Sequence, residues 1–315
     1  MAESTAGRPA FRSGFIAVVG RPNVGKSTLV NRMVGMKVTI TSSRPNTTRR
    51  SVRGVLNREG VQAVFVDTPG LHRPRTDLGL RLNDHVEEAL ADVDAVVVVV
   101  DATAPIGAGD SVVLGRAMKA ARVGGAKRAD FSPTRLFVVV NKVDRASRAS
   151  VLEHLTRAAQ MVGDDGSASA HGPASAEYFP VSAASGEGIA TLVDTLLAGL
   201  PIGPPYFPPE MRSDVQEAFW VAELVREQVL RHVRDELPHA VACRVTEWEW
   251  PVISVEIVVE RDSQKGIVIG RGGQVLKAVG SAVRSELEPG TFLDLRVVVE
   301  PHWQQRPDLI ERLGY

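Results

Sequence analysis

The sequence predicts an α/β protein of two domains, in which a mostly parallel sheet with helices on both faces precedes a smaller α/β domain. Three observations predict this. Between residue 15 and about residue 200, short β-branched runs alternate with helical patterns, which is typical of a parallel sheet covered by helices. Five prolines follow in residues 201–209, where neither a helix nor a central strand can continue. Beyond them, the hydrophobic period changes from helical to alternating.

Composition narrows the class of protein. The chain has 315 residues, 44% of them hydrophobic, and its 37 basic side chains balance 37 acidic ones. This balance excludes a globally disordered chain and a global polycation, so any affinity for nucleic acid must be local. The one cysteine, Cys243, excludes an intramolecular disulfide and a multi-cysteine zinc site. We therefore expect a cytoplasmic protein.

The first domain is expected over residues 14–200, after a flexible tail at residues 1–13 that lacks the apolar core of an export signal. The longest aliphatic run is far too short to cross a bilayer, so it predicts a buried strand and no transmembrane segment. We place a proline-rich linker at residues 201–212 and the second domain at residues 213–315. The expected strands of the first domain are residues 15–19, 63–66, 95–100, 136–140 and 178–181.

A phosphate-binding loop directly follows the first expected strand and precedes a helical segment at residues 28–33. Its glycines allow the backbone to wrap around phosphates. The phosphate charge is met by amide N–H groups, the helix N-terminus and Lys26, while Ser27 can offer its hydroxyl to Mg²⁺. The predicted loop consists of Gly20, Arg21, Pro22, Asn23, Val24, Gly25, Lys26 and Ser27.

Three further motifs stand at the ends of later strands. Asp67 can hold Mg²⁺ through water, and the Gly70 N–H can contact a γ-phosphate. The Asp144 carboxylate can accept both the N1–H and the 2-amino group of guanine, an arrangement that adenine does not present, so GTP is the expected nucleotide. A backbone N–H at Ser182–Ala183 suits guanine O6. The motifs are Asp67, Thr68, Pro69 and Gly70; Asn141, Lys142, Val143 and Asp144; and Ser182 and Ala183.

With these four elements in series, residues 14–200 resemble the translation-factor-like GTPases. The resemblance implies a mobile segment at residues 46–49 whose threonine closes on Mg²⁺, and the Thr-Thr-Arg pattern favours Thr48 over Thr47. Leu71 stands where Ras-like enzymes carry a glutamine that orients water. Because leucine cannot orient water, we expect slow intrinsic hydrolysis and a different source of water positioning. We treat His72 as an ordinary loop residue.

A cation is one candidate for the missing catalytic charge. Asn23 occupies the position at which related Asn-x-Gly-Lys-Ser GTPases help to coordinate potassium, so the resemblance adds K⁺ to GTP, GDP and Mg²⁺ as an expected cofactor. The alternative is that Asn23 only holds the loop through backbone hydrogen bonds. The expected Mg²⁺ ligands are Ser27, Thr48 and Asp67, and the expected catalytic residues are Asn23, Lys26, Thr48 and Gly70.

The second domain is expected to contain a helix at residues 214–237, then two strands, with an alternating period at 252–260, then a helix at 274–287 and a strand at 293–299. A Gly-x-x-Gly loop precedes the second helix, as in KH domains of type II, where it holds a single-stranded nucleic-acid backbone. Trp303 could stack on a base or pack against its own domain. The predicted RNA-binding residues are Gly270, Arg271, Gly272 and Gly273.

A GTPase domain, a proline-rich join and one KH domain together resemble the Era family of bacterial and organellar GTPases. Further matching segments are residues 45–49 and 66–72, Trp303 and residues 313–315. The resemblance implies a monomeric factor that assembles the small ribosomal subunit, binds the 3′ region of its 16S-type rRNA, and associates peripherally with the inner face of the cell membrane. GTP state is expected to control association with RNA and the ribosome.

Two departures from the family keep alternative functions open. Residues 163–176 form an insertion rich in Gly, Ser and Ala, and residues 300–302 replace lysines that are more frequent in the family. Residues 212–315 carry 13 basic and 17 acidic side chains, which favours an alternative in which a membrane or cell-cycle GTPase switch binds protein through a KH-like domain. A tRNA-modification type of GTPase is disfavoured, because its C-terminal cysteine and helical domains are absent.

Overall fold

The computed structural model describes residues 10–315 apart from 72–73, 75, 128–133, 164–175 and 235. Most of the expected tail and insertion, together with His72, therefore lie outside the described residues. The chain folds into two compact units. The first contains residues 1–39, 51–68 and 86–214, and the second contains residues 40–50, 69–85 and 215–315.

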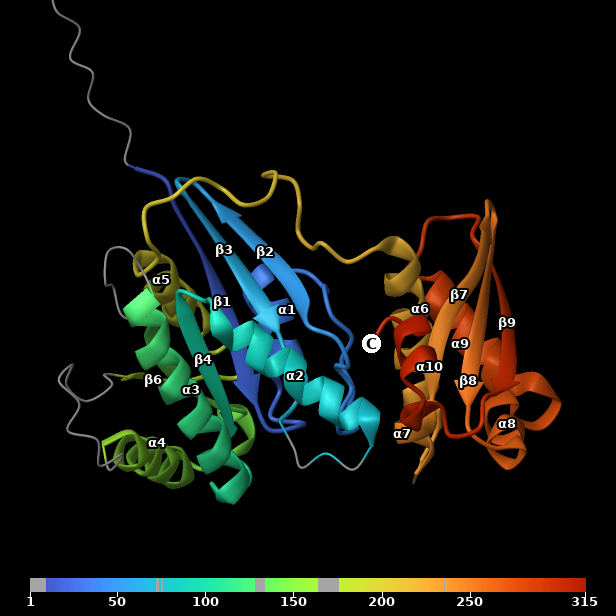
Figure 1. Cartoon of the computed structure of the whole chain (residues 1–315), viewed down its shortest axis with the longest axis horizontal. Coiled ribbons are helices and arrows are strands. Elements are labelled where there is room, and N and C mark those ends of the chain that lie inside the picture. The colour runs from blue at the N-terminus through green and yellow to red at the C-terminus, as the bar shows by residue number, and fades with distance from the viewer. Residues whose placement is uncertain (1–9, 72–73, 75, 128–133, 164–175, 235) are drawn as a thin grey trace, which may run out of the picture. The chain divides into compact units, whose positions relative to one another are not determined.

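The first unit is built on a six-stranded sheet in the order β2-β3-β1-β4-β5-β6 (Figure 1). All neighbouring strands are parallel except β2 and β3. The mostly parallel sheet expected from the sequence is thereby confirmed. The strands are β1 (Arg12–Gly20), β2 (Val52–Arg58), β3 (Val61–Asp67), β4 (Ala95–Asp101), β5 (Arg135–Asn141) and β6 (Ala176–Pro180).

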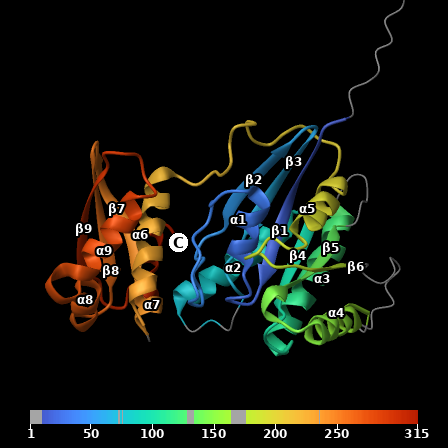
Figure 2. The ribbon, with the colours of Figure 1, turned by 180° about the vertical axis from the view of Figure 1, so that it is seen from behind.

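Helices cover both faces of this sheet because its central strands carry apolar side chains on both sides. On one face, alternate residues such as Val97 pack with α1 (Lys26–Val34) and α5 (Ile189–Ala198), the helices nearest the viewer in Figure 2. On the other face, Val98 and Val138 lie against α3 (Ala108–Lys127) and α4 (Arg148–Gly163). This layering brings the carboxyl ends of the parallel strands to one edge, where ligands bind in such sheets.

The antiparallel edge strand β2 was not expected from the sequence. Its side chains include Arg53, Gly54 and Asn57, so no β-branched run marks it. The chain after α5 also belongs to the first unit: Ile202 pairs with Arg12, and Ser213 pairs with Gly54. This segment therefore forms one bridge to the interior strand β1 and one to the edge strand β2.

The second unit contains a three-stranded sheet in the order β7-β8-β9 (Figure 1). Apolar side chains on one face of β8, such as Ile257, pack with α6 and α9, while Val258 on the opposite face packs with Trp303 and the last helix, α10. Its elements are α6 (Glu217–His232), α7 (Leu237–Ala240), β7 (Ala242–Glu249), β8 (Val252–Val259), α8 (Asp262–Ile269), α9 (Gln274–Arg284), β9 (Phe292–Val299) and α10 (Pro307–Arg312).

Helix α8 is an addition to the expected order of elements. Its N-terminus is held by Gln264, whose Oε1 accepts the backbone N–H groups of Glu260 and Arg261 at 2.8 and 3.1 Å. From α6 onward the order is thus α6, α7, β7, β8, α8, the glycine loop, α9, β9 and α10. Helix α2 (Asp77–Ala91) is divided between the two units.

Candidate functional site

The predicted phosphate loop joins β1 directly to α1. Asn23 and Gly25 adopt left-handed conformations, with φ of 64° and 97°. A Cβ atom at Gly25 would lie 2.3 Å from Nδ2 of Asn141, and one at Gly20 would lie 2.6 Å from the Val99 carbonyl oxygen. These positions therefore require glycine. The first turn of α1 carries no acidic side chain, so its N-terminal N–H groups favour an anion.

Lys26 lies inside this loop and not on its surface. Its side chain is buried, and Nζ donates to the carbonyl oxygens of Gly20 and Arg21 at 3.1 and 2.9 Å. Burial lowers the pKa of Lys26 to about 8, and the nearby Asp67 carboxylate offsets part of this shift. A cation that is held by two backbone carbonyl oxygens is well suited to receive phosphate oxygens in their place.

Ser27 and Asp67, two of the three residues expected to hold Mg²⁺, are in direct contact at the end of β3. Asp67 Oδ2 accepts hydrogen bonds from Ser27 Oγ at 2.7 Å and from Thr39 Oγ1 at 3.0 Å. No group of three or more His, Cys, Asp or Glu side chains arranged for a metal occurs among the described residues. One carboxylate beside hydroxyl groups fits Mg²⁺, which takes hard oxygen ligands and completes its shell with water and phosphate.

Asn141 ties the phosphate loop to the Ser182–Ala183 turn. It is buried; Nδ2 donates to the Val24 carbonyl at 2.8 Å, and Oδ1 accepts the Ala183 N–H at 3.0 Å. Ser182 is also buried, and its Oγ accepts the Ser185 N–H. Asp144, by contrast, is exposed in a short 3₁₀ turn and available to a base.

Lys142 reaches back across the same edge of the sheet. In a left-handed conformation with φ of 67°, it donates through Nζ to the Asn23 carbonyl at 2.8 Å and pairs with Asp101. Burial opposes ionisation of Asp101, but hydrogen bonds from Lys142 and Thr103 hold its pKa below the usual value. These contacts join four segments that are far apart in sequence, which we together call the rim: the phosphate loop at residues 20–27, Asp101 at the end of β4, residues 141–144 and residues 182–183.

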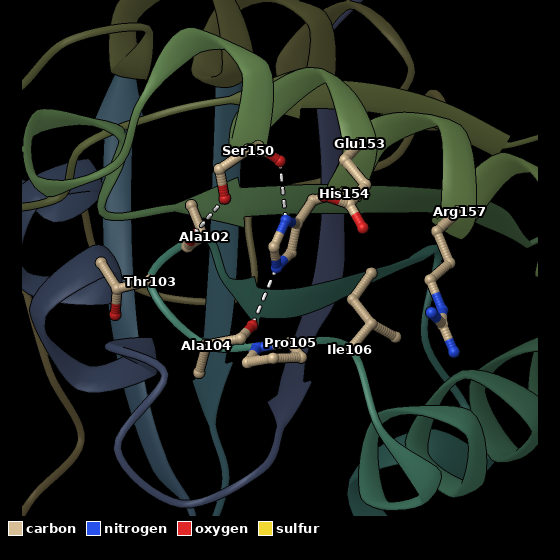
Figure 3. Close-up of a pocket in the computed structure, with 9 residues that line it drawn as sticks. All are labelled: Ala102, Thr103, Ala104, Pro105, Ile106, Ser150, Glu153, His154 and Arg157. Carbon is tan, nitrogen blue, oxygen red and sulfur yellow. Dashed lines mark hydrogen bonds between the residues drawn. The ribbon is translucent and has the colours of Figure 1, made fainter.

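A cavity of about 150 Å³ lies beside this rim, between α4 and the loop after β4 (Figure 3). His154 is buried in its wall, with Nδ1 2.7 Å from the Ser150 carbonyl and Nε2 2.8 Å from the Ala104 carbonyl. Ser150 Oγ donates to the Ala102 carbonyl at 3.0 Å. These hydrogen bonds fix the loop after Asp101 to α4. The residues that line the cavity therefore help to hold Asp101 in place.

The other predicted residues of the site belong to the second unit. Thr48 and Leu71 are buried there, with 8% and 6% of their surface exposed. Gly70 falls in the same unit. Ser27, Asp67 and the base-facing motifs thus belong to the first unit. The two segments expected to respond to a γ-phosphate, residues 46–49 and Gly70, belong to the second.

The Gly-x-x-Gly loop connects α8 to α9. Gly270, Gly272 and Gly273 all have positive φ, of 75°, 57° and 77°. A Cβ atom at Gly270 would lie 2.6 Å from Cγ2 of Val275, whereas Gly272 and Gly273 face open space. Arg271 is exposed at the tip. Trp303 is fully buried, and its Nε1 donates to the Ala240 carbonyl at 2.9 Å, which excludes the base-stacking alternative in this structure.

Two contributors to the rim were not identified from the sequence. Thr39 lies outside every motif, and no local pattern marks it. Asp101 did carry a signal, because it ends a buried strand at the same edge as Asp67 and Asn141.

Comparison with known proteins agrees with this arrangement. A family model described as a 50S ribosome-binding GTPase matches residues 15–142, and a KH domain model matches residues 236–304. GTPase Era of Mycolicibacterium paratuberculosis is 44% identical over 97% of this chain and 99% of its own length. The chain belongs to the Era family of GTPases. The corresponding protein of Mycobacterium tuberculosis is 43% identical with the same coverage.

Solved Era structures share the fold over nearly the whole chain. A crystal structure of an Aquifex aeolicus Era variant bound to GDP·AlF4⁻ has a TM-score of 0.85 and 33% identity. An Era complex with MgGDPNP and nucleotides 1506–1542 of 16S ribosomal RNA has a TM-score of 0.84 and 33% identity. Each covers 97% of this chain and 99% of the other. The chain is therefore a GTPase with a KH domain. No helix in the described part is long and apolar enough to span a membrane.

Proposed function

We propose that this GTPase assembles the small ribosomal subunit, and that its GTP state controls how its KH domain engages the 3′ region of 16S-type rRNA. The observation that carries the proposal is the pairing of a guanine-nucleotide rim in the first unit with an open Gly-x-x-Gly loop in the second. Era in complex with MgGDPNP and a 16S fragment, at 33% identity, supports the same pairing.

Base selection is assigned to the exposed carboxylate of Asp144, which accepts the two guanine hydrogens. Asn141 holds the rim in register, and the Ala183 N–H exchanges its present acceptor, Asn141 Oδ1, for guanine O6. Lys26 leaves its two carbonyl partners for the β- and γ-phosphates. Mg²⁺ supplies charge neutralisation between the phosphates, and Ser27, Asp67 and Thr48 are the residues that hold it.

Hydrolysis needs a substitute for the water-orienting glutamine. Leu71 is buried and apolar, so it cannot perform this role. Asn23 stands at the mouth of the phosphate loop with its carbonyl bonded to Lys142. We assign to Asn23 a potassium ion that stabilises charge developing on the phosphates, and to the Gly70 N–H a contact with the γ-phosphate.

The KH unit is assigned to RNA because its glycine loop admits a close backbone. The open space at Gly272 and Gly273 leaves room for a phosphate, and the N-terminus of α9 follows immediately. Arg271 and Lys277 are exposed beside the loop and supply local positive charge. Because phosphate contacts need positive charge only where the RNA lies, these side chains are compatible with the net negative charge of residues 212–315.

Crosslinking in cells tests the RNA assignment against the alternative of a protein-binding switch. The proposal predicts enrichment of the 3′ end of small-subunit rRNA with the wild-type chain, and loss of that enrichment with Gly272→Asp. Recovery of no RNA would overturn it and favour the protein-binding alternative. Peripheral membrane association and a monomeric state, which the resemblance implies, are tested by vesicle flotation and by light scattering.

A further inference from the structure

Arg21, the second residue of the phosphate loop, reaches helix α3 with its side chain. Its Nε donates to Oδ1 of Asp110 at 2.8 Å, and the two side chains form an ion pair. The Asp110 side chain is 4% exposed, whereas that of Arg21 is 32% exposed. Removing a carboxylate from water is costly unless it is paired and hydrogen-bonded, so Arg21 supplies the charge that makes the burial of Asp110 tolerable.

The other oxygen of Asp110 holds the start of α3. Oδ2 accepts the Gly107 N–H at 2.9 Å. The Gly107 carbonyl in turn accepts the backbone N–H groups of Asp110 and Ser111 at 3.0 and 3.1 Å. Asp110 is therefore fixed within its own helix, and it offers Arg21 an anchor that does not depend on the phosphate loop.

Gly109 leaves room for the stem of the arginine. A Cβ atom at Gly109 would lie 2.6 Å from Cδ and 3.4 Å from Cγ of Arg21. A Cβ atom at Gly115, in the same helix, would meet no described atom within 4 Å beyond its chain neighbours and its own helix backbone. Neither glycine has a positive φ, so alanine suits the backbone at both positions. The first turn of α3 is thus shaped around Arg21.

Side chains outside the phosphate loop hold it at more than one point. Nδ2 of Asn141 donates to the Val24 carbonyl, and Nζ of Lys142 donates to the Asn23 carbonyl, each at 2.8 Å. Both of these side chains belong to the guanine motif after β5. Asp110 holds the beginning of the loop in the same way, although it lies in none of the sequence motifs.

We propose that Asp110 is a positioning residue for nucleotide binding, and that it fixes the first half of the phosphate loop through Arg21. The Arg21 carbonyl accepts Lys26 Nζ at 2.9 Å, so the ion pair also orients a partner of the loop's lysine. This inference rests on the proposed function of residues 20–27 as a phosphate loop. All of these residues belong to the first unit.

The ion pair acts by ordering the loop before a nucleotide arrives. A loop that is already ordered loses less conformational freedom on binding, and its affinity is higher for that reason. The backbone of such a loop meets the α- and β-phosphates, which GDP and GTP share. Loss of the ion pair should therefore weaken both nucleotides equally and leave the preference between them unchanged.

The test titrates the full chain with a fluorescent GDP and with a fluorescent non-hydrolysable GTP analogue, each with Mg²⁺. Asp110→Asn keeps an oxygen for the Gly107 N–H but loses the charge, and Arg21→Gln removes the other partner. Each should weaken both nucleotides about 5- to 30-fold. The double variant should bind within about twofold of the weaker single variant, because no pair is left to break. Losses that multiply in the double variant would overturn the proposal.

Gly109→Ala separates positioning from stability. The added methyl group displaces the Arg21 stem without removing a polar group, so affinity for both nucleotides should fall about 3- to 10-fold. The urea midpoint should equal or exceed that of wild type, because alanine favours a helix. Gly115→Ala is the matched control and should stay within about twofold in affinity. Unchanged affinity in Gly109→Ala, or an equal loss in Gly115→Ala, would contradict the proposal.

A second control tests the loss of charge alone. Arg116 of α3 pairs with Glu87 at 2.6 Å, and both side chains are exposed. Arg116→Gln should leave both affinities within about twofold of wild type, and a loss as large as that of Arg21→Gln would count against positioning. If Asp110→Asn fails to fold, the other variants decide. Wild-type affinity in Lys26→Met would instead contradict the assignment of the phosphate loop itself.

Discussion

Replacing Asn141 by alanine should destabilise the nucleotide-free protein, because the side chain joins two buried backbone groups. The substitution leaves the Val24 carbonyl and the Ala183 N–H without their present partners, at 2.8 and 3.0 Å. An unpaired buried group costs about 1 to 3 kcal/mol. Allowing for partial relaxation, we expect a loss of about 2 to 4 kcal/mol in the free energy of unfolding.

Urea denaturation followed by far-ultraviolet circular dichroism measures this loss. With a slope of about 2 kcal/mol per molar urea, the midpoint should fall by about 1 to 2 M. Asp144→Ala is the matched control, since that side chain is exposed on the same rim and its removal should change stability by less than about 0.5 kcal/mol. Equal midpoints for Asn141→Ala and wild type, or equal losses in the two variants, would refute the reasoning.

Four further predictions concern the same two sites. Asp144→Asn should lower GTP affinity by about 2 to 4 kcal/mol in calorimetry, because an amide cannot accept both guanine hydrogens, and unchanged affinity would remove it from the base site. Burial lowers the pKa of Lys26 to about 8, so between pH 8 and 10.5 only the unfolded chain keeps the proton, and the free energy of unfolding should rise by about 3 kcal/mol across this range. The difference between the urea midpoints of wild type and Lys26→Met should increase with pH. A difference that does not change with pH would count against this prediction. Gly272→Asp should weaken RNA binding in anisotropy titrations without changing GTP affinity, whereas Gly272→Asn should be affected less because it adds no charge; equal RNA affinity in all three proteins would argue against recognition by this loop. Single-turnover hydrolysis should be faster in KCl than in NaCl, and Asn23→Ala should abolish the difference; equal wild-type rates would exclude potassium.

Buried parallel strands could be predicted because a short, continuous apolar run suits a strand that is covered on both faces. Residues 95–100 mark β4 in this way, and the motifs that follow such strands necessarily gather at one edge of the sheet. The edge strand β2 lacks this signal. Helix α8 was missed because Ile267, Val268 and Ile269 are consecutive and only Val268 is buried, so no helical period shows.

The same distinction applies to the functional residues: those in local motifs could be predicted, and those placed by long-range packing could not. Asn141 and Lys26 occur in motifs whose local geometry dictates their surroundings, although the burial of Lys26 among carbonyl groups was not expected. The pairing of Arg21 with Asp110 depends on tertiary packing between residues 89 positions apart. No local pattern encodes such a contact, and only the folded structure reveals it.

Control of RNA binding by the nucleotide is the central claim, and one titration tests it most directly. A labelled RNA copy of the 3′ end of small-subunit rRNA is titrated with the full chain in the presence of either Mg·GDP or Mg²⁺ with a non-hydrolysable GTP analogue. The account predicts at least about tenfold tighter binding with the GTP analogue, which corresponds to about 1.4 kcal/mol of coupling between the nucleotide and the KH unit. Equal affinities in the two nucleotide states would contradict it.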